Sequence, residues 1–188
     1  NYNLGLVEKE KSPFVYISNK ANNTLNKDKI YIVDLTNNHL DKIEFNLSGE
    51  AKLLITGTIK NINLIFNNIE LKTKKDIYRN DKNLFTSCIT FYEAEFLENV
   101  NIASKNFECE DSINIVKSKE KIKNIHIENS KFDGLDVDFS NINFNNILVR
   151  NSGNDCVDLS FGNFFIDTLD LANCRDKSLS VGEGSILN

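Results

Sequence analysis

The sequence predicts an all-β solenoid, in which short parallel strands coil around one core with a repeat of 22 residues. Apolar residues recur at this interval over residues 107–181, and within each segment they alternate with polar residues, which is strand spacing and not helix spacing. Runs of Ser, Asn, Gly and Asp between the segments supply turns. Three apolar sets share the period: Ile113, Leu135, Val157 and Leu179; Ile125, Ile147 and Leu169; and Ile142, Phe164 and Ile186.

One coil can be read between residues 135 and 149. Strands are predicted at 135–139, 142–144 and 147–149, with two-residue turns at 140–141 and 145–146. In the first strand apolar residues alternate with Asp136 and Asp138, so we expect Leu135 and Val137 to face the core and the acids to face outward. Three strands in each coil predict three parallel sheets around one core.

This pattern resembles that of the right-handed parallel β-helix proteins, the pectate-lyase-like superfamily. The resemblance rests on repeated Asn-Ile-x-Ile-x-Asn and Asp-x-apolar-x-apolar units, and it covers roughly residues 43–188. It implies a single-stranded right-handed parallel β-helix with three sheets. Residues 176–183 are also similar to a segment of bacterial β-helix regions that can accompany kinase-like spore-coat-H domains.

Residues 1–40 lack the repeat and are predicted to be an N-terminal cap or lead-in, followed by the β-helix over 41–188. Residues 14–17 and 30–33 are predicted to be short strands of this region. A cap is expected because the bare end of a solenoid exposes apolar core and unpaired strand edges. No cap follows Ile186 and Leu187, so we expect either a longer native chain or a partner domain or chain at the C-terminal end.

Two insertions interrupt the repeat. Residues 64–71 match residues 142–149 almost position for position, which predicts the second and third strands of an earlier coil there. The next strand begins at Ile89, so residues 72–88 form an insertion rich in Lys and Arg. Insertions in repeat proteins often lie on the binding face, and the alternative interpretation is a solvated charged loop. A smaller insertion lies at 117–123.

Composition excludes several classes of function. The chain has 188 residues and 40% hydrophobic residues, enough for one domain with a core. Its net charge is −5 and uneven, since residues 126–188 carry ten acids and four bases. This pattern lacks the basic footprint of nucleic-acid-binding proteins, and no apolar run is long enough to span a membrane.

The four cysteines have no metal-binding spacing such as C-x-x-C. We interpret them as small packed or turn residues, and a Cys88–Cys109 disulfide is the alternative. Cys156 and Cys174 fall in different columns of the repeat.

His126 is predicted to be exposed on the outer face of a strand. Asn129, Asn151 and Asn173 form a column that predicts a structural ladder of amide groups.

Two acidic columns are the candidate site. Stacked carboxylates repel, so they require raised pKa values, a cation or basic neighbours. Alternatively, these acids cap turns and keep the sheet soluble. The first column is Asp111, Asp133, Asp155 and Lys177, and the second is Asn114, Asp136, Asp158 and Ser180. We predict Asp133 and Asp155 as metal ligands, with Ca²⁺ the natural cation, and Asp136, Asp158, Arg150 and Lys177 as ligand-binding residues.

The resemblance implies a protein that handles polysaccharides outside the cell or at its surface. The first interpretation is a non-catalytic bacterial module that binds glycan or supports a larger cell-surface or secreted protein. The alternative is a polysaccharide-processing enzyme, a Ca²⁺-assisted lyase or epimerase, with its site on the acidic face of the first sheet and Arg150 or Lys177 as base. A third interpretation is an assembly element whose open end pairs with another chain.

Overall fold

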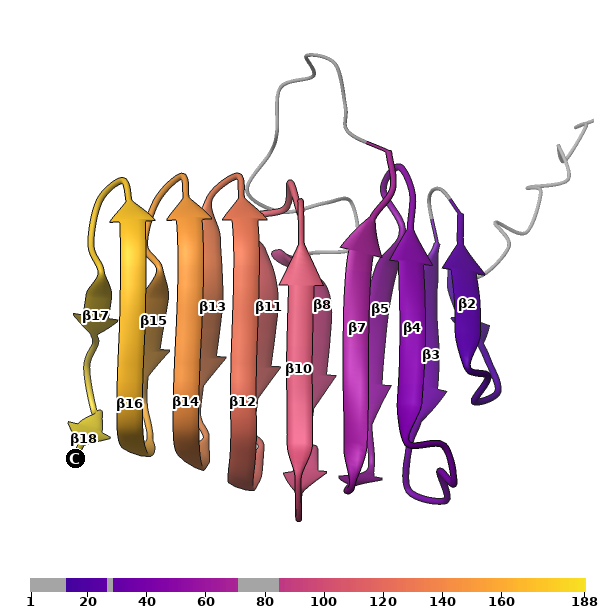
Figure 1. The fold of residues 1–188 in the computed structure, drawn as a ribbon, viewed down its shortest axis with the longest axis horizontal. Coiled ribbons are helices and arrows are strands. Elements are labelled where there is room, and N and C mark those ends of the chain that lie inside the picture. Colours follow the sequence, from indigo (N-terminus) through magenta and orange to yellow (C-terminus); the bar gives the residue numbers. More distant parts are fainter. Residues whose placement is uncertain (1–12, 27–28, 71–84) are drawn as a thin grey trace, which may run out of the picture.

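The computed structural model describes residues 13–26, 29–70 and 85–188, and every regular element within them is a β-strand. These strands form a solenoid of about seven turns, with coils of about 22 residues. In Figure 1 the strands of one sheet run upward at the front, those of the other run downward behind, and successive coils step toward the C-terminal end. This winding is right-handed, and the predicted parallel β-helix is confirmed.

Pairing divides the described strands between two parallel sheets, which face each other in Figure 1, and not among the three sheets predicted. The eight-stranded sheet contains β1 (Phe14–Tyr16), β3 (Ile30–Asp34), β5 (Lys52–Thr56), β8 (Ser87–Tyr92), β11 (Asp111–Val116), β13 (Asp133–Asp138), β15 (Val157–Ser160) and β17 (Leu179–Val181). The ten-stranded sheet contains β2 (Asn22–Leu25), β4 (Lys42–Leu47), β7 (Ile62–Asn68), β10 (Val100–Lys105), β12 (Lys119–Ser130), β14 (Asn141–Ser152), β16 (Asn163–Cys174) and β18 (Ile186–Leu187), and the short strands β6 (Thr58–Ile59) and β9 (Glu95–Phe96) join it through β12.

The predicted second and third strands of a coil are continuous in the last three full coils. The expected turn at 145–146 lies inside β14, where Asn146 pairs with Asn124 and Thr168. Because the ladder continues at Asn146, β12, β14 and β16 are each 12 residues long. In the earlier coils, by contrast, β6 and β9 are separated from β7 and β10.

The core follows the predicted register. Leu135 pairs with Val157, which pairs with Leu179, and Ile125 pairs with Ile147. The side chains of Leu135, Val137, Val157 and Leu159 are fully buried. Burial of such side chains contributes about 1.5–3 kcal/mol each and supplies most of the stabilisation.

Three details of the predicted register are wrong. Phe164 pairs with Leu187 and not Ile186, because the turn with Gly184 at φ +67° adds a residue to the last coil. Leu64 pairs with Ile102, so residues 64–68 lie in the third strand of their coil and not the second. The first strand of the 135–149 coil ends at Asp138, because Phe139 adopts φ +50° and turns outward, where its side chain is 56% exposed.

The described part of the first 40 residues continues both sheets. The predicted strands are present as β1 and β3, and β3 pairs with β5. The polar segment between them contains β2, which pairs with β4. These strands occupy the N-terminal end of the stack, where the cap was expected (Figure 1).

The predicted asparagine ladder runs along the corner at the C-terminal ends of β10, β12, β14 and β16. The side-chain amide of Asn129 donates to Asn106, that of Asn151 to Asn129, and that of Asn173 to Asn151, over 2.8–2.9 Å. All four residues have φ between 59° and 65°, a left-handed conformation that asparagine tolerates well. The column is therefore structural.

Two disulfides tie neighbouring coils at the same corner and correct the interpretation of the cysteines as unbonded packed residues. Cys88 bonds Cys109, with Cα atoms 5.5 Å apart, and Cys156 bonds Cys174, with Cα atoms 5.3 Å apart. The second pair was missed because its members fall in different columns. They meet because the bond crosses a corner of the coil instead of following a strand.

Replacing Cys156 and Cys174 by Ser is expected to lower the free energy of unfolding by about 3 kcal/mol, because the bond closes a loop of 18 residues. Calorimetry should show a melting temperature roughly 6–12 °C below that of the oxidised parent. Mass spectrometry without reductant should find no free thiol in the parent. Free thiols in the native parent, or an unchanged melting temperature, would contradict the assignment.

Candidate functional site

A groove lies on the outer side of the ten-stranded sheet, where the short strands β6 and β9 meet the long β12. It has a volume of about 630 Å³, within the range of about 300–1,000 Å³ found for ligand sites. Eight of its ten lining residues are polar or charged, and Leu97 is an exposed apolar side chain. The lining residues are Lys60, Asn61, Phe96, Leu97, Glu98, Asn99, Glu120, Lys121, Lys123 and Asn145.

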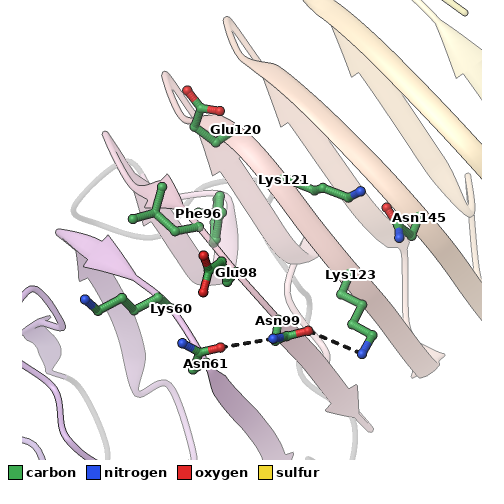
Figure 2. A pocket seen from close by; sticks show the side chains of 10 residues that line it. Lys60, Asn61, Phe96, Glu98, Asn99, Glu120, Lys121, Lys123 and Asn145 are labelled. Atoms are coloured by element: carbon green, nitrogen blue, oxygen red, sulfur yellow. Dashed lines mark hydrogen bonds between the residues drawn. The ribbon is translucent and has the colours of Figure 1, made fainter.

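The floor of the groove is held by the stacked turns that follow β6 and β9. Asn61 and Asn99 adopt φ 49° and 52° there, and the backbone N–H of Asn61 donates to the carbonyl of Glu98 over 2.6 Å. The Asn99 side-chain amide donates to Asn61 over 3.1 Å, and the Lys123 ammonium donates to Asn99 over 3.4 Å. Figure 2 shows this chain of hydrogen bonds crossing three neighbouring coils, with Lys121 extended toward Asn145.

The groove carries charges that have no ion-pair partner. In the described part of the chain, Lys60, Lys121 and Lys123 form no salt bridge, whereas Lys105 and Lys119 on nearby strands pair with glutamates. Glu98 and Glu120 also lie unpaired at the groove. Ammonium, carboxylate and amide groups are thus available to a ligand that offers hydroxyl and anionic groups.

In the first acidic column, Asp133 and Asp155 cap backbone N–H groups of the neighbouring coil. The Asp133 carboxylate accepts hydrogen bonds from the Asn154 amide and the backbone N–H of Asp155, both over 2.7 Å. The Asp155 carboxylate accepts the backbone N–H of Lys177 over 2.9 Å and lies 3.5 Å from its ammonium. Each acid therefore holds the turn of the next coil, the structural alternative considered for this column.

Three residues of the second column form a crowded acidic face on β11, β13 and β15 together with Asp111 of the first column and with Asp138. We define this acidic face as Asp111, Asn114, Asp136, Asp138 and Asp158. Register places Asp136 between Asn114 and Asp158 on the neighbouring strands. The Asn114 amide donates to Asp136 over 3.3 Å and to Asp138 over 3.4 Å, which are long hydrogen bonds.

Burial is the main cause of the raised pKa values on the acidic face. Desolvation, followed by the charge of Asp111, raises the pKa of Asp136 to about 9. Desolvation also raises the pKa of Asp111 to about 6, although a hydrogen bond from Thr86 acts to lower it. Desolvation by burial is also the largest cause of the raised pKa values of Asp133 and Asp138. A buried carboxyl without a basic neighbour favours its neutral form.

The predicted basic residues lie elsewhere. Arg150 belongs to β14, and its guanidinium donates to the carbonyl and carboxylate of Asp170 on the ten-stranded sheet. The Lys177 ammonium lies 3.5 Å from both Asp155 and Asp176. The structure therefore brings Asp136 and Asp158 together but does not bring Arg150 to them. His126 is exposed, as predicted, and lies 3.1 Å from Glu128.

No group of three His, Cys, Asp or Glu side chains among the described residues stands ready to hold a metal ion. Asp133 and Asp155 as metal ligands remain a prediction. Most of the basic insertion, residues 72–84, lies outside the described residues.

Two features of the surface were missed from the sequence. The groove lies where strands of unequal length adjoin, in coils that depart from the 22-residue period. The rings of Phe139 and Phe161 stack with centroids 5.0 Å apart at an exposed corner, whereas no exposed aromatic pair was predicted. The 22-residue spacing of Phe139 and Phe161 indicated that they stack. It did not indicate that both residues adopt a left-handed backbone conformation, which turns their rings outward.

Comparisons of the chain with protein-family models, with curated proteins and with solved structures find no match. The resemblances to the pectate-lyase-like superfamily and to the β-helix regions beside spore-coat-H-like kinase domains remain predictions. No helix in the described ranges has the length and apolar character needed to cross a membrane.

Proposed function

We propose that the chain is a non-catalytic module that binds a glycan in the groove. The observation that carries the proposal is the convergence of Lys60, Lys121 and Lys123 on a groove that also presents amide groups. None of the three forms an ion pair with a residue that the structure describes. Amides hydrogen-bond sugar hydroxyls, and ammonium groups bind carboxylate or sulfate. An anionic glycan offers both kinds of partner.

The regularity of the solenoid supports a polymeric ligand. Neighbouring strands place equivalent side chains about 4.8 Å apart along the axis. Asn61 and Asn99 stack in this way, and Lys123 continues the row. A linear polymer laid along the axis meets similar groups at each step.

An extracellular or cell-surface location fits this function. The two disulfides in the described residues persist best in oxidising compartments. In such a setting the solenoid also serves as a rigid spacer in a larger secreted protein. A partner at the C-terminal end fits the exposed side chains of Val181 and Ile186 on the last described strands.

A glycan array with neutral, uronate-containing and sulfated chains tests the proposal, together with turnover assays on the same glycans. Binding of anionic glycans without product formation is expected. Binding should weaken as salt is raised, because exposed charges are screened. Turnover by the parent chain would contradict a non-catalytic role, and an array without hits would contradict glycan binding.

Lys121→Ala with Lys123→Ala is expected to raise the Kd for the best anionic glycan about tenfold or more, because charge-assisted hydrogen bonds are lost. The measurement is isothermal titration calorimetry. The matched control is Lys20→Ala with Lys131→Ala, which removes two exposed lysines that do not line the groove. Equal losses in both double variants would show a general charge effect and not a site.

A further inference from the structure

The outer surface of the ten-stranded sheet continues from the groove toward the C-terminal end. Lys121, which lines the groove on β12, pairs with Asn143 on β14, and Asn143 pairs with Phe165 on β16. All three side chains are exposed, whereas Ile142 and Phe164, one residue earlier on their strands, are buried. Because side chains alternate between the two faces of a sheet, the three exposed residues form one outward row.

The side-chain amide of Asn143 is not used by the solenoid itself. On the same strand, the Asn146 amide donates to Asn124 of the neighbouring coil over 2.9 Å. The Asn143 side chain has no hydrogen-bond partner among the described residues, since its neighbours in the row are Lys121 and Phe165 and not asparagines. Asn143 therefore offers both donors and an acceptor to a ligand.

Phe165 presents an aromatic ring to solvent at the end of this row. Its side chain is 46% exposed, and its ring stacks on no other aromatic ring of the described residues. Phe161, which is equally exposed, instead stacks on Phe139 with ring centroids 5.0 Å apart. The face of an aromatic ring is electron-rich and attracts polarised C–H groups. The ring of Phe165 is thus available to the C–H face of a sugar.

We propose that Asn143 and Phe165 extend the glycan site beyond the groove, with one sugar ring stacked on Phe165. This inference rests on the proposed function, because the groove anchors the same glycan chain. The extended site runs over β6, β9, β12, β14 and β16, which pair in that order. Four strand spacings give it a length of about 19 Å, so the ligand that fills it is an oligosaccharide and not a single sugar.

The charge of the extended site changes along its length. The ammonium groups of Lys60, Lys121 and Lys123 lie at the groove. Asp167 is exposed two residues beyond Phe165 on the same strand, which places it on the same face. Since its carboxylate repels an anionic group, the sugar on Phe165 is uncharged. The ligand class is therefore a glycan that contains both anionic and neutral sugars.

The test compares a disaccharide and a hexasaccharide of a glycan that alternates uronate with neutral sugars, by nuclear magnetic resonance titration of the full chain. The parent should bind the hexasaccharide more tightly than the disaccharide. Phe165→Ala should raise the Kd of the hexasaccharide about three- to tenfold, because the stacked sugar loses its partner. The Kd of the disaccharide, which the groove alone holds, should not change. Phe165→Tyr keeps the ring and should bind the hexasaccharide as the parent does.

The matched control is Phe161→Ala, which removes an equally exposed ring outside the row and should leave both Kd values unchanged. An unchanged Kd of the hexasaccharide in Phe165→Ala, or an equal loss in Phe161→Ala, would overturn the extension while binding of the disaccharide upholds the groove. Equal binding of the two lengths by the parent would overturn it as well. If neither length binds, the extension is wrong, and the glycan array decides the proposed function by itself.

Discussion

Replacing Val157 by Asp is expected to lower the free energy of unfolding by about 3–5 kcal/mol, because it places a charge without a partner between two coils. The Val157 side chain is fully buried, and its strand pairs on both sides, with Leu135 and with Leu179. Domains of this size are stabilised by only about 5–15 kcal/mol. Urea unfolding followed by circular dichroism gives the loss.

The control for this variant is Val181→Asp, at a valine that is 46% exposed on the last strand of the same sheet. It should cost less than about 1 kcal/mol, because the new carboxylate stays in water. Equal losses at the two positions would contradict the assignment of residue 157 to the core.

Stability is expected to fall as pH rises from 5 to 8 in the absence of divalent cations. Burial raises the pKa of Asp136 to about 9 from its ordinary value of 3.8. Between these two pKa values Asp136 keeps its proton in the folded chain and has lost it in the unfolded chain, so raising the pH favours unfolding. The slope for one such proton is about 1.4 kcal/mol per pH unit. The pKa of Asp111, raised to about 6, adds to the effect at the lower end.

The groups facing Asp136 are the carboxyls of Asp111, Asp133, Asp138 and Asp158, none of them basic. Asp136→Asn is therefore expected to flatten the pH profile between 6 and 8 and to be more stable than the parent at pH 8. Asp167→Asn, at an exposed acid, should follow the parent. Urea unfolding in the presence of a chelator measures the free energy of unfolding at each pH. Parallel pH profiles for the parent and Asp136→Asn would show that the Asp136 carboxyl does not have a raised pKa in the folded chain.

The repeat was predictable because the apolar residues that recur every 22 positions are the residues that pack in the core. Their spacing is the strongest signal in the chain. Val157 and Leu135 could be assigned inward and Asp136 outward from alternation alone, and the structure confirms them. The asparagine ladder was predictable for the same reason, since a fixed period stacks identical amides. Chemical identity and spacing were sufficient in both cases.

Other features depend on geometry that spacing does not encode. Phe139 continues the apolar alternation in sequence but turns outward at φ +50°. Cys156 and Cys174 occupy different columns and meet only across a corner. The groove arises where β6 and β9 are shorter than β12, so its lining residues share no period. Burial of the acidic face, and with it the pKa of Asp136, depends on tertiary packing that the sequence does not state.

The most direct test of the central claim, that the groove binds a glycan, is nuclear magnetic resonance of the isotope-labelled chain titrated with the best anionic glycan. The backbone amide signals of residues 60, 61, 97–99, 120, 121 and 123, which line the groove, are expected to shift. Signals from the acidic face on the other sheet should stay in place. Shifts centred on β11, β13 and β15, with the groove unchanged, would contradict the account.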